Sequence, residues 1–178
     1  MIAIPDHEYM FVPMRFMKTL NRIFPVPADN HYQGTLAALY FFYVITGATL
    51  VRSLIHIIAA DGGAQSIATI PLAHYRADAT AAVILIFSYW GISQLIAGLV
   101  YLLVGLFYRS LVPLMYLLLF LEYSLRLLLD HLKPMHTMVV PPGSYGNYVM
   151  IPLALLLFFL SLNPWNRTMT PNDPVAKS

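Results

Sequence analysis

The sequence predicts an all-α integral membrane protein: a four-transmembrane-helix bundle with an N-terminal amphipathic interfacial helix. The first observation is composition, since the 178 residues are 59% hydrophobic and only 10% charged. The mean hydropathy of +0.69 is too high for an ordinary soluble domain. The second is segment length, because a helix needs about 20 apolar residues to cross the hydrocarbon core. Four apolar stretches are long enough, at residues 34–60, 79–108, 111–129 and 146–163.

The charged residues and the missing cysteines exclude several kinds of chemistry. Ten Lys and Arg against eight Asp and Glu leave a formal charge of +2, so we expect no nucleic-acid partner. The absence of Cys excludes thiol redox chemistry, Cys-ligated metals and disulfides. The histidines show no metal-ligand spacing, and no phosphate loop, nucleophile elbow or dinucleotide fingerprint occurs. We therefore assign no metal ligand and no catalytic residue, leave the cofactor unknown and favour a non-enzymatic role.

Residues 1–33 form an N-terminal arm that is too polar and too rich in proline to span a membrane. Arg15, Lys18 and Arg22 follow one another at helical spacing and share one face, while Met and Phe side chains supply apolar surface. This pattern predicts an interfacial helix on an anionic membrane surface, to which each basic residue contributes about 1 kcal/mol. The alternative is a solvated or partner-packed arm.

The first span, residues 34–60, becomes polar along one face of its second half. The residues on this face recur at i, i+3, i+4 and i+7, and they are Thr49, Arg52, Ser53 and His56. The pair Gly62 and Gly63 predicts the end of the helix, because glycine readily adopts the left-handed turn that follows a helix. The next helix opens at Pro71 or after Asp78, and we favour Asp78 as its cap.

The second span, residues 79–108, carries glycines spaced by sevens, at Gly91, Gly98 and Gly105. Small residues along one stripe allow the backbone of another helix to approach, which is a common way for membrane helices to associate. Glycine also lowers helix propensity, so three on one line indicate a packing role. The third span follows after a tight turn, so these two helices run antiparallel.

The third span, residues 111–129, is interrupted by charges that continue just past its end on one helical stripe: Glu122, Arg126 and Asp130. Charged groups inside a membrane are costly and need partners. Arg126 follows Glu122 by four residues and Asp130 follows Arg126 by four, the spacing of ion pairs on a helix surface. Such a paired stripe can also serve only to set helix register.

Positions at equal distances from the turn at Arg109 should lie at similar depth in the second and third spans. This register places Gln94 beside Glu122 and Gly91 near Arg126. The polar face of the first span would approach the outer end of the same stripe. We therefore expect a polar funnel in the outer half of the bundle, lined by Arg52, His56, Gln94, Glu122, Arg126 and Asp130.

The fourth span, residues 146–163, has no charge and contains Pro152, and a polar tail follows at residues 164–178. An even number of spans places both termini on one side. That side holds six of the ten basic residues, so the positive-inside rule places both termini in the cytoplasm. We expect a multi-pass protein of the bacterial cytoplasmic membrane.

Three functions remain open at this point. The first is a non-catalytic accessory or structural subunit that packs against a larger membrane complex, respiratory or photosynthetic, or against a second copy of itself. The alternative is a small transporter or carrier that binds a proton, an anion, a lipid or a quinone in the funnel around Glu122 and Arg126. An enzyme acting on a lipid, with Glu122 or His56 as base, comes last.

Overall fold

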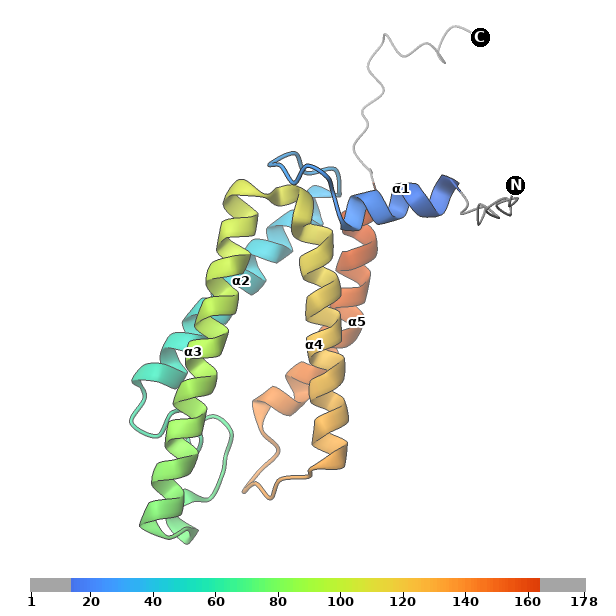
Figure 1. Cartoon of the computed structure of the whole chain (residues 1–178). Coiled ribbons are helices and arrows are strands. Elements are labelled where there is room, and N and C mark those ends of the chain that lie inside the picture. The colour runs from blue at the N-terminus through green and yellow to red at the C-terminus, as the bar shows by residue number, and fades with distance from the viewer. Residues whose placement is uncertain (1–13, 164–178) are drawn as a thin grey trace, which may run out of the picture.

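The computed structural model describes the backbone of residues 14–163 and their side chains from Met17 onward. This part of the chain is all-helical. Its elements are α1 (Met14–Ile23), α2 (Leu36–Ile58), η1 (Leu72–His74), α3 (Ala77–Phe107), η2 (Arg109–Leu111), α4 (Val112–Leu132) and α5 (Pro142–Leu162), where η marks a short 3-10 helix. Within the described residues, the four helices α2 to α5 are long and apolar enough to cross a membrane (Figure 1). The predicted fold class is therefore confirmed.

Local sequence explains where several helices begin and end. Thr35 caps α2, because its Oγ1 accepts a hydrogen bond from the backbone N–H of Ala38 at 3.4 Å. Gly62 and Gly63 follow α2 with φ angles of 61° and 77°, which glycine adopts without strain. Pro113 lies in the first turn of α4, where the missing N–H of proline costs no helical hydrogen bond.

The helix α3, the second span, begins at Ala77, which is earlier than the apolar pattern indicates, and Asp78 is not its cap. Arg76 precedes its first residue and makes no side-chain cap. Asp78 instead lies inside the first turn, where its carboxylate accepts a hydrogen bond from the N–H of Ala79 at 3.0 Å. A carboxylate in the first turn is favourable because the N-terminal end of a helix carries partial positive charge.

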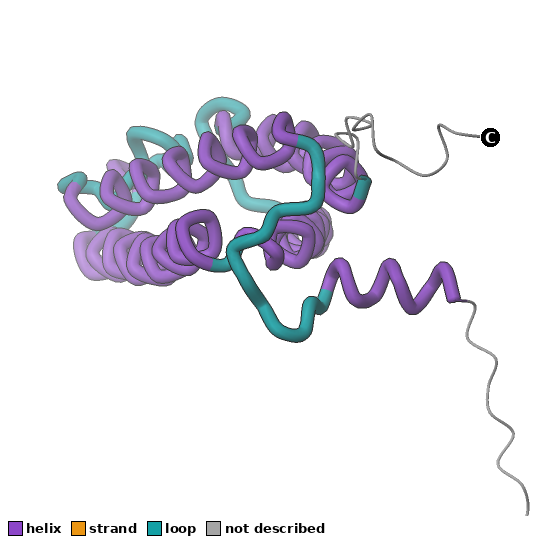
Figure 2. The backbone as a smooth tube through the Cα atoms, turned by 90° about the horizontal axis from the view of Figure 1, so that it is seen from above, coloured by secondary structure: helices purple, strands orange, loops and turns teal. Residues whose placement is uncertain are grey.

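The four long helices form two antiparallel pairs. α2 packs along α3, and α4 packs along α5, whereas the two pairs contact each other much less extensively. Viewed from the end at which α1 lies, α1 extends sideways beyond the four spans (Figure 2). The bundle is therefore two helical hairpins side by side, with α1 at one end.

The apolar core joins the two pairs in the half of the bundle nearest α1. The ring of Phe42 is fully buried and lies 5.9 Å from the ring of Tyr101 and 5.8 Å from that of Tyr116. The Tyr116 hydroxyl donates a hydrogen bond to the carbonyl of Ala38 at 2.6 Å. Leu157 of α5 is buried in the same cluster. All four spans therefore meet in this half.

The glycine stripe of α3 faces α2. The nearest side-chain atoms to a Cβ built at Gly91, Gly98 and Gly105 belong to His56, Leu50 and Tyr43, respectively. The register taken from the turn had placed Gly91 near Arg126 of α4. The structure instead places His56 of α2 against Gly91, because α3 packs along α2 and makes few contacts with α4.

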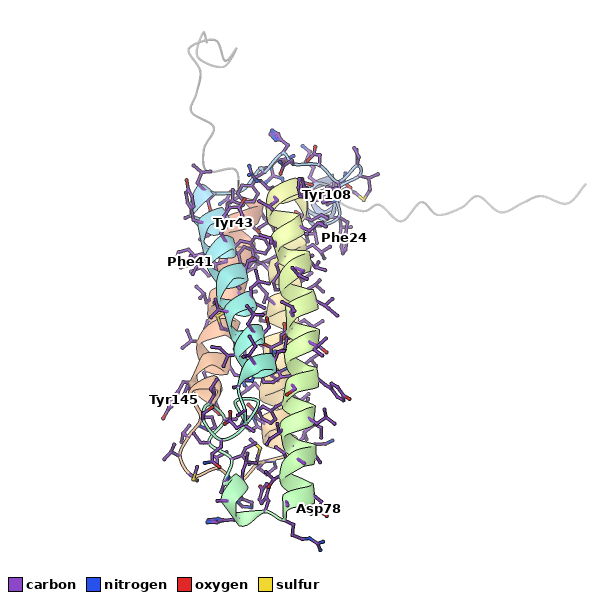
Figure 3. All side chains as sticks on the ribbon, turned by 90° about the vertical axis from the view of Figure 1, so that its left-hand side faces the viewer. Phe24, Phe41, Tyr43, Asp78, Tyr108 and Tyr145 are labelled. Atoms are coloured by element: carbon purple, nitrogen blue, oxygen red, sulfur yellow. The ribbon has the colours of Figure 1, made fainter. Side chains whose placement is uncertain are left out.

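The helix α1 lies at one end of the bundle and projects sideways from it, roughly perpendicular to the spans (Figure 1). Figure 3 shows Phe24, just after α1, at the same end as Tyr108, and Asp78 at the opposite end. The guanidinium of Arg22 donates a hydrogen bond to the carbonyl of Leu162, the last residue of α5, where a cation is favourable. Among the other residues assigned to a membrane surface, Lys18 is exposed, and the side chain of Arg15 lies outside the described part.

The two hairpins meet again at the end far from α1. The loop at residues 59–76 folds back on α3, held by a small core of Ala64, Ile70 and Leu72. In that loop, the Oγ1 of Thr69 donates a hydrogen bond to the carbonyl of Val139 at 2.7 Å, and the backbone carbonyl of Thr69 accepts one from the N–H of Met138 at 2.9 Å. These two bonds tie the loop of one hairpin to the loop of the other.

Candidate functional site

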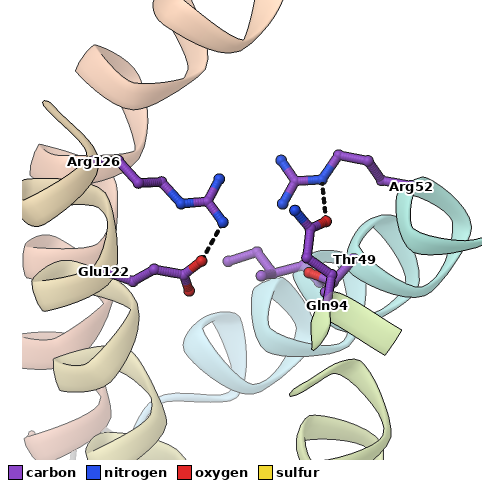
Figure 4. Close-up of polar contacts among 6 residues, drawn as sticks. Thr49, Arg52, Gln94, Glu122 and Arg126 are labelled. Atoms are coloured by element: carbon purple, nitrogen blue, oxygen red, sulfur yellow. Dashed lines mark hydrogen bonds and ion pairs between the residues drawn. The ribbon is translucent and has the colours of Figure 1, made fainter. Parts of the chain in front are cut away.

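Polar side chains of three spans meet in the half of the bundle far from the apolar core. Arg52 comes from α2, Gln94 from α3 and Arg126 from α4 (Figure 4). Because α2 ends at Ile58 and α4 at Leu132, both arginines lie about 9 Å inside their helix ends at 1.5 Å per residue. A charged group at that depth of a membrane needs polar partners.

Arg52 and Gln94 form the first contact of this cluster. The Nε of Arg52 donates a hydrogen bond to the Oε1 of Gln94 at 3.0 Å. Gln94 is only 5% exposed, and its Nε2 is buried without a hydrogen-bond partner. A buried amide N–H that lacks a partner is costly. Within residues 14–163, Arg52 has no carboxylate within ion-pair distance.

Arg126 and Glu122 form the second contact. They are one helical turn apart on α4, and the guanidinium of Arg126 donates a hydrogen bond to the carboxylate of Glu122. Their side chains are 22% and 40% exposed, respectively. This pair has the spacing that the sequence indicates for a helix-surface ion pair. Glu122 therefore pairs with Arg126 within α4. Gln94 pairs with Arg52 within the other hairpin, formed by α2 and α3.

Trp90 contacts both arginines, although it was absent from the predicted funnel. The Cζ of Arg52 lies 5.8 Å from the centre of its ring, and the Cζ of Arg126 lies 5.2 Å from it. Both distances fall within the range of cation–π attraction. The available signal was its position four residues before Gln94, which places both side chains on one face of the helix.

The two guanidinium groups point toward each other, with the amide of Gln94 beside Arg52 (Figure 4). Arginine remains protonated in proteins, so this cluster brings together two positive charges and the single carboxylate of Glu122. Like charges repel more strongly in a low-dielectric interior than in water. The arrangement is a set of hydrogen-bond donors with excess positive charge, which fits a negatively charged ligand group.

His56 lies beside this cluster and is held by the adjoining loop. It is 2% exposed, and its Nδ1 lies 2.7 Å from the carbonyl oxygen of Gly62. Because a carbonyl only accepts, Nδ1 carries the proton in this hydrogen bond. The His56 ring lies 4.8 Å from the ring of Trp90. His56 therefore positions Trp90 and packs against Gly91, with its Nδ1 directed to the loop.

Asp130 faces α5 and is separate from this cluster. Its carboxylate accepts a hydrogen bond from the side-chain amide of Asn147 at 2.9 Å. The funnel expected from the sequence included Asp130 together with Arg52, but α4 packs along α5 rather than along α2. The structure therefore brings together four of the predicted residues, Arg52, Gln94, Glu122 and Arg126. Trp90 contacts both arginines, and His56 packs against Trp90.

A cavity of about 110 Å³ adjoins Arg52. It is partly open and is lined by Ile45, Ala48, Thr49, Arg52, Tyr123 and Met150. One water molecule needs about 10–15 Å³ by this measure, so the cavity has room for a larger group. It lies between α2, α4 and α5.

Across the described residues, no group of three His, Cys, Asp or Glu side chains is arranged to hold a metal ion. No protein-family model matches the sequence, and no curated protein or solved structure matches the chain. The fold is compatible with a multi-pass membrane protein. The chemistry of the cluster therefore carries the functional argument.

Proposed function

We propose that this protein is a non-catalytic membrane binder or carrier of an anionic group, which it holds between Arg52, Gln94 and Arg126. The observation that carries the proposal is the pairing of two opposed guanidinium groups with a buried amide Nε2 that has no partner. An anion placed there would accept hydrogen bonds from all three side chains. It would also offset the repulsion between the two arginines.

Binding can be measured through Trp90, which contacts both guanidinium groups. The chain has two tryptophans, so Trp165→Phe leaves Trp90 as the sole tryptophan reporter. We expect inorganic phosphate or dodecyl phosphate, titrated into the protein in a nonionic detergent, to change the Trp90 fluorescence saturably. Arg52→Gln and Arg126→Gln should each weaken that binding by about tenfold or more, because hydrogen bonds to charged groups contribute about 1.5–3 kcal/mol.

Glu122→Gln gives the opposite expectation. It removes the one carboxylate in contact with the cluster, so we expect tighter anion binding. Arg76→Gln is the matched control, because Arg76 is exposed at the start of α3, with an 88% exposed side chain, and should leave affinity unchanged. A purely structural ion pair predicts instead that no probe saturates, and this result would remove the proposal.

A second candidate is the accessory or structural subunit of a larger membrane complex. It is supported by the surface of α3, a helix of 31 residues of which the 18-residue apolar stretch is only 17% buried. This face is available to lipid or to another membrane protein. Isolation from the native membrane in a mild detergent tests this candidate: a partner at fixed stoichiometry supports it, and a solitary monomer counts against it.

A further inference from the structure

We infer that the ligand of the anion site is a lipid-like amphiphile, with its anionic head between the two arginines and its hydrocarbon chain in the adjoining cavity. This inference rests on the proposed anion binding and adds the class of molecule. Ile45, Ala48 and Thr49 line the cavity together with Arg52. These residues share one face of α2 by their helical spacing. The apolar wall therefore continues directly from Arg52.

The direction of the cavity matches the orientation of a lipid in one leaflet. Ile45 lies seven residues before Arg52, which places it about 10 Å farther from the nearer end of α2, at Ile58. The apolar part of the cavity is therefore deeper in the hydrocarbon than the arginine. A lipid whose head lies toward the nearer surface has the same order of head and chain.

The walls of the cavity suit hydrocarbon better than a hydrated ion. Ile45, Ala48 and Met150 are apolar, and the hydroxyl of Thr49 already donates to the carbonyl of Ile45 at 2.9 Å. A polar ligand or water held there needs several polar partners. Among the described residues of this region, the unsatisfied buried polar atom is the Nε2 of Gln94, at the arginine cluster.

A sideways route from the bilayer is available between the two hairpins. The cavity is partly open, and α2 contacts α5 much less extensively than it contacts α3. A chain can therefore enter between α2 and α5 without separating the tightly packed pair of α2 and α3. A soluble anion would not enter by this apolar route, because it would have to leave water for hydrocarbon.

Three probes separate this inference from the proposed function. Dodecyl phosphate carries head and chain, inorganic phosphate carries the head alone, and dodecanol carries the chain alone. We expect dodecyl phosphate to bind at least about tenfold tighter than inorganic phosphate at one fixed detergent concentration, and dodecanol to give no saturable response. Equal affinity for the two phosphates would overturn the lipid inference and leave anion binding intact. No response to either phosphate would overturn the proposed function.

Filling the cavity gives the second test. Ala48→Phe places a ring where the chain is expected, so it should weaken dodecyl phosphate binding by about tenfold. Gly47→Leu is the control, because a Cβ at the neighbouring Gly47 meets no atom within 4 Å, and its affinity should match the unsubstituted protein. Met150→Phe fills the cavity from α5 and serves where Ala48→Phe does not fold. Unchanged dodecyl phosphate affinity in a folded cavity variant would refute the inference.

Discussion

At Gly91 there is no room for a methyl group. A Cβ there would lie 2.8 Å from the Cβ of His56 and 3.1 Å from the carbonyl oxygen of Ser53. Neither atom is the flexible end of a side chain, so α2 and α3 would have to move apart. At Gly98 the close atom is the Cδ2 of Leu50, at 2.7 Å, which a rotamer change can displace. Close approach of backbones is the role that small residues fill between membrane helices.

These differences predict a graded series of alanine substitutions. Gly91→Ala should destabilise the protein by about 1–3 kcal/mol, the usual cost of overpacking, and Gly98→Ala should cost less. Gly47→Ala should be neutral or stabilising by up to about 1 kcal/mol, because it meets open space and gains helix propensity. Reversible unfolding in mixed micelles measures the free energy of unfolding of the three variants. Equal destabilisation at Gly91 and Gly47 would show that helix approach is not limiting.

The turn after α2 is organised by Asp61. Its carboxylate accepts backbone hydrogen bonds from Gly63 at 2.9 Å, Gln65 at 3.0 Å and Ser66 at 2.6 Å. Partial burial raises the pKa of Asp61, but the hydrogen bonds from Ser66, Gly63 and Gln65 outweigh it and lower the pKa from 3.8 to about 2. The same turn presents the carbonyl of Gly62 to His56. Asp61 therefore supports the position of His56 behind the cluster.

The lowered pKa gives a pH prediction for this element. The folded protein holds Asp61 ionised more strongly than the unfolded chain does, so its stabilising effect is present above about pH 4 and is lost as pH falls toward about 2. Asp61→Asn should be less stable than the unsubstituted protein at neutral pH, and the difference should shrink across that window. Asp78→Asn, at the same end of the bundle, is the comparison: its carboxylate accepts one backbone hydrogen bond where that of Asp61 accepts three, so its stability gap should be smaller. A stability gap that is constant with pH would contradict this role.

At the scale of the whole molecule, the two hairpins are joined near both ends, and between these joints Arg126 of one hairpin lies against Trp90 of the other. The aromatic core around Phe42 and Tyr116 joins them near α1, and Thr69 joins the loops at the other end. The cluster of Arg52, Gln94 and Arg126 lies in the region between these joints, among α2, α3 and α4. This arrangement allows two arginines from different hairpins to face each other.

Orientation is testable directly because the chain contains no cysteine. His31→Cys and Gln65→Cys place exposed thiols at opposite ends of the bundle. If both termini are cytoplasmic, an impermeant maleimide should label Gln65→Cys in intact cells and His31→Cys only after the cells are opened. The reverse pattern would invert the proposed orientation. Labelling of both from one side would show that α2 does not span the membrane.

Much of the architecture could be predicted from local pattern. Span length and apolarity indicate the four helices, because a membrane helix must satisfy its own backbone hydrogen bonds along its whole length. Gly62 and Gly63 indicate a turn, and the spacing of Glu122 and Arg126 indicates an ion pair within one helix. Each of these features depends on neighbours within a few residues of the chain.

The sequence by itself determined the helices, their antiparallel order and the residue types of the polar cluster. Only the tertiary structure decided which helices pair, because a glycine stripe fits any helix that can approach it. Pairing of α3 with α2 placed His56, not Arg126, against Gly91. Pairing of α4 with α5 brought Asp130 within hydrogen-bond distance of Asn147. Arg52 and Arg126 were thereby left facing each other across Trp90, an arrangement that depends on contacts between helices far apart in the chain.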